Sequence, residues 1–172
     1  MRLYIGIVTT LSRIAGVAAV LLLVAAVLVV TQMVIMRYAL GASTIWQTEF
    51  VIYAIVAATF LGSPQVLIER GHVGVDLLPN ALGPRGRLWL EALGGALSLA
   101  FCGALAWSGW LYFHEAWAGG WKTETVWALP LWIPLLPLPL GIGLLSLQYI
   151  AEIAQLSSGR TLSGSHMPEV AQ

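Results

Sequence analysis

The residues of this 172-residue chain that could do chemistry stand at the ends of long apolar segments. Trp46 and Glu49 open one of these segments, and Arg70, His72 and Asp76 follow its other end. Ion or proton pathways normally place charged side chains inside a membrane span, and membrane haem proteins place axial histidines there. The sequence shows neither pattern, and it shows no nucleophile–base constellation and no metal-ligand spacing. We therefore predict no catalytic residue, no cofactor, no metal site and no enzyme activity.

The composition indicates the class of protein. Hydrophobic residues make up 59% of the chain and charged residues only 9%, and the mean hydropathy is +0.85. These values are typical of an integral membrane protein and not of a soluble domain. The formal net charge is zero, so nothing indicates nucleic acid as a partner. The single cysteine, Cys102, lies in an apolar run and is predicted to be a packing residue.

Ionisable residues divide the chain into uncharged spans of about 19 to 27 residues, each long enough to cross a bilayer as a helix. The spans are bracketed by Arg13 and Arg37, Glu49 and Glu69, Glu91 and Glu115, and Glu124 and Glu152. The sequence therefore predicts an all-α integral membrane protein with four transmembrane helices, which form one membrane domain over residues 1–156. The polar tail, residues 157–172, is predicted to be disordered.

The distribution of basic residues predicts the orientation. With four spans both termini lie on one side of the membrane. The arginines that share this side are Arg2, Arg13, Arg70, Arg85, Arg87 and Arg160. Only Arg37 and Lys122 fall on the other side, so the positive-inside rule favours cytoplasmic termini. Tryptophans gather at the opposite, outer ends of the spans, where they are expected to anchor the protein in the bilayer surface: Trp46, Trp110, Trp117, Trp121 and Trp127.

Small residues recur every four positions in two of the spans. The second span carries Ala54, Ala58 and Gly62 at this spacing. Such a row makes a smooth face that lets another helix approach closely, so we predict that it packs on a helix; chance in an alanine-rich span is the alternative. The third span carries a similar row: Ala96, Ala100, Ala104 and Ser108.

The connection between the second and third spans has apolar residues at helical spacing: Val73, Leu77, Leu78, Ala81 and Leu82. We predict a short amphipathic segment in the cytoplasmic interface, with a plain loop as the alternative. Arg70 and Asp76 are predicted to fix the turn into this segment, with His72 hydrogen-bonding nearby. Alternatively, Arg70 only holds the span at its depth beside lipid phosphates.

Prolines set the last span apart from the others, at positions 130, 134, 137 and 139. A proline inside a helix removes one hydrogen bond and clashes with the preceding turn. We therefore predict a kink or local unwinding near Pro137 and Pro139, in the middle of the span. Neighbouring helices or water must cover the backbone groups that such a break leaves free.

Several short motifs, in this order and spacing on four spans, resemble the small membrane subunit of tripartite ATP-independent periplasmic (TRAP) transporters. The resemblance extends from about Arg13 to Glu152. The motifs are Arg37-Tyr38, Trp46 with Glu49, Phe60-Leu61-Gly62, Arg70-Gly71-His72-Val73, Val75-Asp76-Leu77, Leu78-Pro79, and the run from Leu129 to Pro134 that contains Pro130 and Pro134. The chain departs from the family pattern at Thr48, where a second acid is common beside the one matched by Glu49.

The resemblance implies a scaffold subunit in the bacterial inner membrane and not a catalyst. It implies two protein partners, a large membrane subunit and a periplasmic substrate-binding protein, and the sodium-driven uptake of an organic acid or related solute. Sodium coupling is expected in the large subunit and not in this chain. Two other classes remain as alternatives, a membrane anchor subunit of a redox complex and a small oligomeric exporter.

Overall fold

The computed structural model of the protein describes residues 2–69, 84–125 and 127–157. Within these residues the regular elements are helices: α1 (Arg2–Ala39), α2 (Trp46–Ile68), α4 (Pro84–Ala118), α5 (Trp132–Leu135) and α6 (Pro137–Ser157). Four stretches are long and apolar enough to cross a membrane: Leu3–Ala39, Trp46–Ile68, Leu93–Ala118 and Trp132–Ala154. The predicted all-α membrane fold with four transmembrane helices is therefore confirmed.

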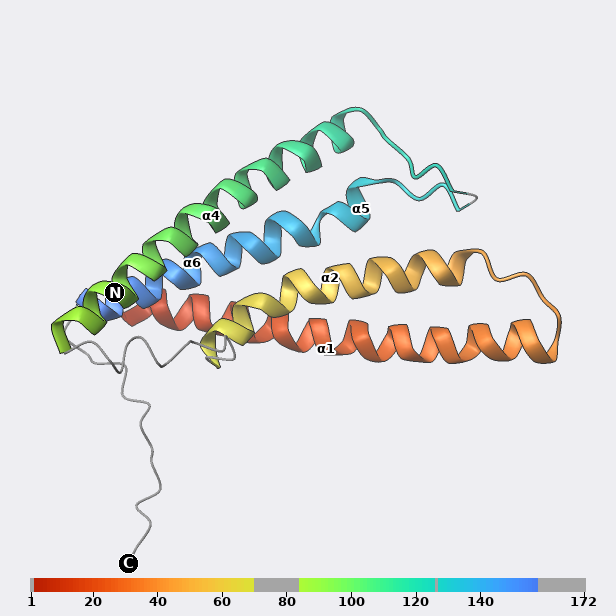
Figure 1. Ribbon diagram of the computed structural model, residues 1–172. Helices are drawn as coiled ribbons and strands as arrows, with labels where there is room; N and C mark the ends of the chain where they lie inside the picture. The colour runs from red at the N-terminus through yellow and green to blue at the C-terminus, as the bar shows by residue number, and fades with distance from the viewer. Residues whose placement is uncertain (1, 70–83, 126, 158–172) are drawn as a thin grey trace, which may run out of the picture.

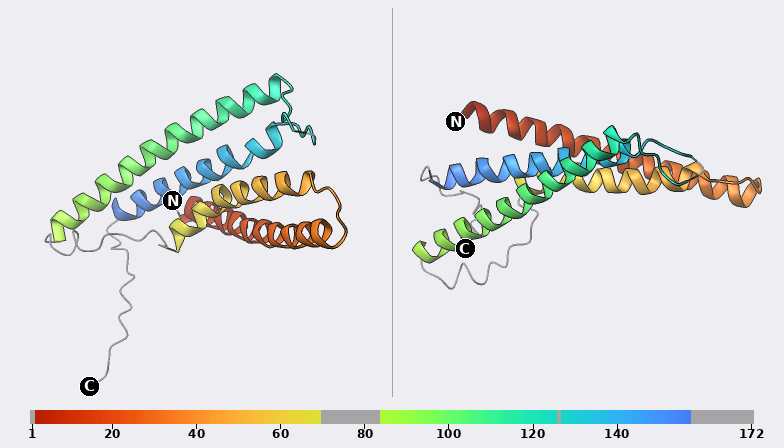
Figure 2. Two further views of the ribbon diagram at one scale, coloured as in Figure 1. Left: turned by 45° about the vertical axis from the view of Figure 1, so that its right-hand side comes forward. Right: turned by 90° about the horizontal axis from the view of Figure 1, so that it is seen from above.

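The long helices pack in a row and not around a common axis (Figure 1). Helix α1 packs along α2, α2 packs against α6, and α6 packs against α4. Helix α1 also contacts α6, whereas α4 contacts neither α1 nor α2 within the described residues. Seen from above, the helices form a layer from which the beginnings of α1 and α4 diverge to opposite sides of α6 (Figure 2). Helices α2 and α6 thus lie in the middle of the row.

The two ends of this row differ. Helices α1 and α4 begin at one end, where α2 and α6 finish; we call it the terminal end (Figure 1). The other end, the loop end, carries the connection between α1 and α2 and the segment 119–131. The predicted interfacial segment falls mostly on residues 70–83, which lie outside the described residues. Pro84 is the first residue of α4, a position that proline favours because its missing N–H has no helical partner there.

Two of the helices are much longer than a bilayer is thick. Helix α1 has 38 residues and α4 has 35, so at a rise of 1.5 Å per residue they measure roughly 57 and 52 Å. The hydrocarbon core of a bilayer is about 30 Å thick. These helices must therefore tilt in the membrane or extend beyond its hydrocarbon core.

The last span is broken beside Pro137, as its prolines predict, but this break lies near the start of the helical part and not in its middle. The short helix α5 is separated from α6 at Leu136. The amide of Leu140 then donates to the carbonyl of Leu136 over 3.4 Å, a long bond. Residues 119–125 and 127–131 lie outside the helices, so the helical part of the last span begins at Trp132, later than the charge spacing indicates.

A small apolar cluster joins the middle of the row to one edge. Its buried members come from α2, α4 and α6: Leu67, Cys102, Ile142 and Leu145. Most other large apolar side chains are exposed, with Val27 and Leu28 on α1 as examples. Lipid tails are as apolar as these side chains, so their exposure carries no penalty in a bilayer. Close packing of small residues must therefore hold much of the row together.

Candidate functional site

The predicted packing residues of α2 lie against α1. Ala54 and Ala58 are buried, with only 4% and 5% of their surface exposed. A Cβ atom at Gly62 would lie 3.4 Å from the Cβ of Ala19, which is ordinary van der Waals contact. The row of small residues that the sequence predicts to face a helix thus faces one within the same chain.

Helix α1 contributes a matching seam that the sequence reading missed. Its buried positions are Val8, Ser12, Ala15, Ala19 and Ala26. They recur at spacings of three, four and seven residues, the pattern of a helix packed along its length by one face. The signal was available in the sequence, but the surrounding valines and leucines hid it because the whole helix is apolar. Small residues on both helices let the two backbones approach closely.

Helices α2 and α6 approach each other closely at Gly141. A Cβ atom at this position would overlap the backbone carbonyl of Phe60 and would lie 3.0 Å from the amide nitrogen of Leu61. That carbonyl lacks its usual helical donor because Pro64, four residues later, has no N–H. Ser63 supplies a replacement, since its hydroxyl donates to the Phe60 carbonyl over 2.8 Å. The proline of α2 and the glycine of α6 therefore belong to one packing arrangement.

Glu49 connects the start of α2 to the loop-end segment 119–131. Its side chain is 9% exposed, and one carboxylate oxygen accepts a hydrogen bond of 2.7 Å from the hydroxyl of Thr125. Thr125 in turn lies 3.0 Å from the hydroxyl of Thr123. The carboxylate occupies the first turn of α2, where the helix dipole favours a negative charge. Glu49 thus acts as a structural acceptor that fixes the loop.

The loop-end segment is a short hairpin and not an irregular loop. Lys122 and Pro130 form an antiparallel bridge. The amide of Thr123 donates to the carbonyl of Leu129 over 2.9 Å, and the amide of Leu131 donates to the carbonyl of Trp121 over 2.8 Å. Pro130 fits at the bridge because the two bonds are made by the residues on either side of it, so its missing N–H breaks neither of them, and its own carbonyl accepts from the amide of Ile133. This hairpin was absent from the sequence prediction, which assigned residues 125–131 to the last span.

Aromatic pairs join the hairpin to α2, and α5 to the end of α4. Trp46 of α2 lies 6.3 Å from Trp127, measured between ring centroids. The ring of Trp117 at the end of α4 meets that of Trp132 edge-on at 4.7 Å. Such pairs stabilise a structure beyond the burial of their surface. The predicted residue Trp46 therefore holds the hairpin, and Pro134 lies in the single turn of α5 that follows it.

Arg37 closes the connection between α1 and α2. Its guanidinium donates a hydrogen bond of 2.8 Å to the hydroxyl of Thr44, which is buried. The backbone turns at Gly41, whose φ of +61° is readily adopted by glycine. The amide of Ala42 donates to the carbonyl of Met36 and completes the end of α1. Arg37 is thus a capping residue of the loop end.

A comparison with protein-family models shows the family of the chain. Residues 26–159 match the model described as "Tripartite ATP-independent periplasmic transporters, DctQ component". The chain belongs to the DctQ family. This DctQ chain is also similar to the C4-dicarboxylate TRAP transporter small permease protein DctQ of Vibrio cholerae, with 26% identity over 148 residues. The alignment covers 74% of the chain and 64% of the relative, so the chain spans less than two thirds of the relative's length. The family is a transporter component, which agrees with the resemblance seen in the sequence.

The remaining predicted site residues of this DctQ chain, Arg70, His72 and Asp76, lie outside the described residues. Their predicted role in the turn after α2 stays a prediction. Among the described residues, no group of three or more His, Cys, Asp or Glu side chains is placed to hold a metal ion.

The second row of small residues is exposed, whereas the first packs on a helix of the same chain. Ala96, Ala100, Ala104 and Ser108 of α4 are all exposed. The side of α4 that packs on α6 is another one, where Gly109 lies against Leu138.

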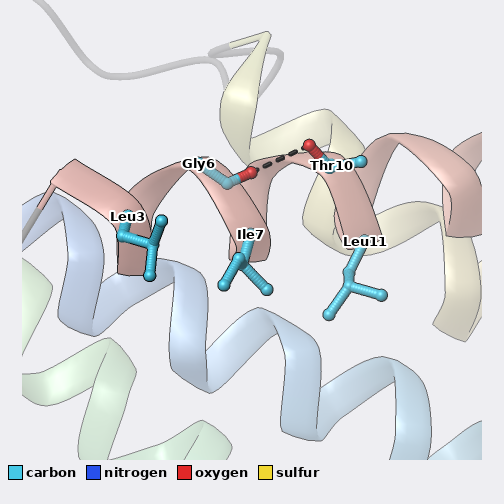
Figure 3. A pocket seen from close by; sticks show the side chains of 5 residues that line it. All are labelled: Leu3, Gly6, Ile7, Thr10 and Leu11. Atoms are coloured by element: carbon cyan, nitrogen blue, oxygen red, sulfur yellow. Dashed lines mark hydrogen bonds between the residues drawn. The ribbon is translucent and has the colours of Figure 1, made fainter.

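At the terminal end, α1 leaves a shallow apolar groove of about 500 Å³ open beside α6 (Figure 3). The groove is lined by Leu3, Gly6, Ile7, Thr10 and Leu11.

Proposed function

We propose that this TRAP small subunit is the fixed partner of a large permease subunit in the bacterial inner membrane. The complex takes up an organic acid or related solute, driven by sodium, after a periplasmic substrate-binding protein delivers it. The substrate and sodium sites belong to the large subunit. The Vibrio cholerae relative is named a C4-dicarboxylate transporter component, which supports an organic acid as the substrate class.

One observation carries the proposed pairing. The row of helices leaves α4 as an edge, and the small residues on its exposed face are covered by no other helix among the described residues. A row of small residues permits close packing of a second helix in lipid, where van der Waals contact drives association. The first such row, on α2, is already used within the chain. The second row is therefore where we place the large subunit.

We place the terminal end in the cytoplasm. Arg13 and the beginning of α4 lie toward this end, whereas Arg37 and Lys122 lie at the loop end. The arginine excess of the sequence thus marks the terminal end as cytoplasmic by the positive-inside rule. The hairpin and its tryptophans then lie at the periplasmic surface, where they hold the subunit at a fixed depth.

Co-purification with a large TRAP permease subunit from the same organism tests the proposal. We expect a stable complex that transports an organic acid in vesicles when sodium and the binding protein are present. Replacing Ala100 and Ala104 by leucine should weaken the complex without unfolding the isolated chain. Gly6→Leu is the control, because Gly6 is also exposed and has no heavy atom near its Cβ position. A complex that withstands the α4 change excludes this face, and failure to bind any large subunit refutes the function.

A further inference from the structure

Among the described residues, three of the four buried polar side-chain atoms without partners lie toward the terminal end of the row, and the fourth, Gln47 Oε1, lies near the loop end. Within the part of the chain that the structure describes, Ser12 Oγ on α1, Gln65 Oε1 on α2 and Gln148 Oε1 on α6 have no hydrogen-bond partner. Ser12 is completely buried, and Gln148 is 6% exposed. A buried polar atom without a partner destabilises a protein, and in lipid the surroundings offer no donor. Three of them on three helices require an explanation.

Ser12 faces the junction of α1 with both α2 and α6. Gly16, one turn further along α1, is covered by the side chain of Gln65, whose Cβ and Cγ lie 2.8 Å from the Cβ position of the glycine. Two turns before Ser12, the hydroxyl of Tyr4 donates to the carbonyl of Leu147 on α6 over 3.2 Å. Residues four apart on a helix share a face. Ser12 therefore lies between a contact with α2 and a contact with α6.

Gln148 reaches the same junction from α6. Gly141, Leu145 and Gln148 follow one another at helical spacing on the face of α6 that packs on α2. Gly141 lies against the backbone of α2, and Leu145 packs in the cluster that contains Leu67. The residue before Gln148 is the one that Tyr4 of α1 contacts. Gln148 is buried, and these neighbouring contacts place its side of α6 toward α1 and α2.

A polar path leads from this junction to the surface. The side-chain nitrogen of Gln65 donates to a carboxylate oxygen of Glu69, one turn nearer the terminal end. Glu69 is exposed. Gln65 consequently joins an exposed carboxylate to the buried junction, and its own Oε1 remains an acceptor inside it.

We propose that the junction of α1, α2 and α6 is a binding site for ordered water, held by Ser12, Gln65 and Gln148. Water is the ligand whose chemistry fits, because it donates two hydrogen bonds to the amide oxygens and accepts one from the serine hydroxyl. Buried waters typically make about three such bonds. The bound water joins the beginning of α1 to α2 and α6. The hydrophobic effect does not drive helices together in lipid, so such polar bonds stabilise the contact between them.

Thermal unfolding of the purified full chain in lipid nanodiscs tests the proposal, because removing a partner of the water should lower the Tm and not raise it. Ser12→Ala and Gln148→Met each remove one partner of the water while keeping similar volume. Each should lower the Tm by roughly 2–4 °C. In the double variant the losses should be less than additive, because both residues act through the same water. Thr10→Val is the control, since the exposed hydroxyl of Thr10 bonds only to Gly6 of its own helix, and its Tm should be unchanged.

Two further measurements separate the alternatives. A density map of the unaltered chain at a resolution that shows waters should contain a peak within hydrogen-bond distance of Ser12 Oγ and a glutamine oxygen. A map with Ser12 bonded directly to Gln148 and no such peak overturns the proposal. A rise in Tm for either single variant also overturns it, because it means that the oxygens are buried dry. Replacing sodium by choline should leave the Tm unchanged; a sodium-dependent Tm means that the ligand is a cation and not water.

Discussion

Two glycines two positions apart on α6 give the sharpest test of the helix row. Gly141 lies against the carbonyl of Phe60, whereas Gly143 has no heavy atom within 4 Å of its Cβ position. Both are inside the same helix. Gly141→Ala and Gly143→Ala therefore make the same chemical change in the same helix, and they differ in what the new methyl group meets.

The magnitude follows from two opposing effects. Alanine is favoured over glycine inside a helix by roughly 0.5–1 kcal/mol, and both variants gain this term. At Gly143 nothing opposes it, so that variant should be slightly stabilised. At Gly141 the methyl group meets the backbone of α2, which no rotamer change can move, and overpacking costs about 1–3 kcal/mol. The two variants should therefore differ by roughly 1–3 kcal/mol, with Gly141→Ala the less stable.

Cys102 provides the assay. It is the single cysteine of the chain and is 8% exposed, so a thiol-reactive fluorophore labels it when the helices separate. At about 2–4 °C for each kcal/mol, the Tm of Gly141→Ala should fall roughly 2–12 °C below that of Gly143→Ala. Equal Tm values, or a higher Tm for Gly141→Ala, would refute the close approach of α2 and α6.

Other contacts lead to further expectations. Ser63→Ala removes the hydroxyl that donates to the Phe60 carbonyl, which Pro64 has already deprived of its helical partner. The variant should be less stable by about 0.5–2 kcal/mol in the same thermal assay. An unchanged Tm would mean that water or another group replaces the hydroxyl. Thr125→Val keeps the shape of the side chain but leaves the carboxylate of Glu49 without this donor. The free energy of unfolding should fall by about 1–3 kcal/mol, and protease cleavage of the hairpin should become faster. Equal cleavage rates would contradict the role of the bond. In a chain without its native thiol, cysteines introduced at Ser43 and Gly86 should label from opposite sides of the membrane, and labelling of both from one side would contradict the four-span topology.

The row arrangement explains why this chain suits a partner. A closed bundle surrounds its packing surfaces with its own helices, whereas a row leaves both broad sides and both edges available. Here α1 and α4 form the edges, and α4 has an exposed face of small residues. The tight contacts, Ala19 with Gly62 and Gly141 with Phe60, lie inside the row. The chain is therefore held together by small residues along its middle, and it leaves a face of small residues exposed on α4 at one edge.

The sequence by itself determined the four spans, the common side of the termini and the break in the last span. These properties depend on local effects. The transfer of about 20 apolar residues into lipid favours each span, and the missing N–H of a proline favours a break in a helix. The start of the last helical span was predicted too early, because the length of an uncharged stretch includes any uncharged loop. Residues 125 and 127–131, in the second half of the hairpin, occupy the start of that stretch, and the bridge from Lys122 to Pro130 leaves no periodic signal.

Tertiary structure alone decided which faces meet. The rows of small residues on α2 and α4 have the same spacing, yet Ala58 is buried and Ala100 is exposed. Hydropathy cannot separate them, because a face toward lipid and a face toward a helix are equally apolar. The bond from Thr125 to Glu49 joins residues 76 positions apart. Such contacts depend on the order of helices in the row, and that order follows from the fit of small residues and freed backbone groups between helices.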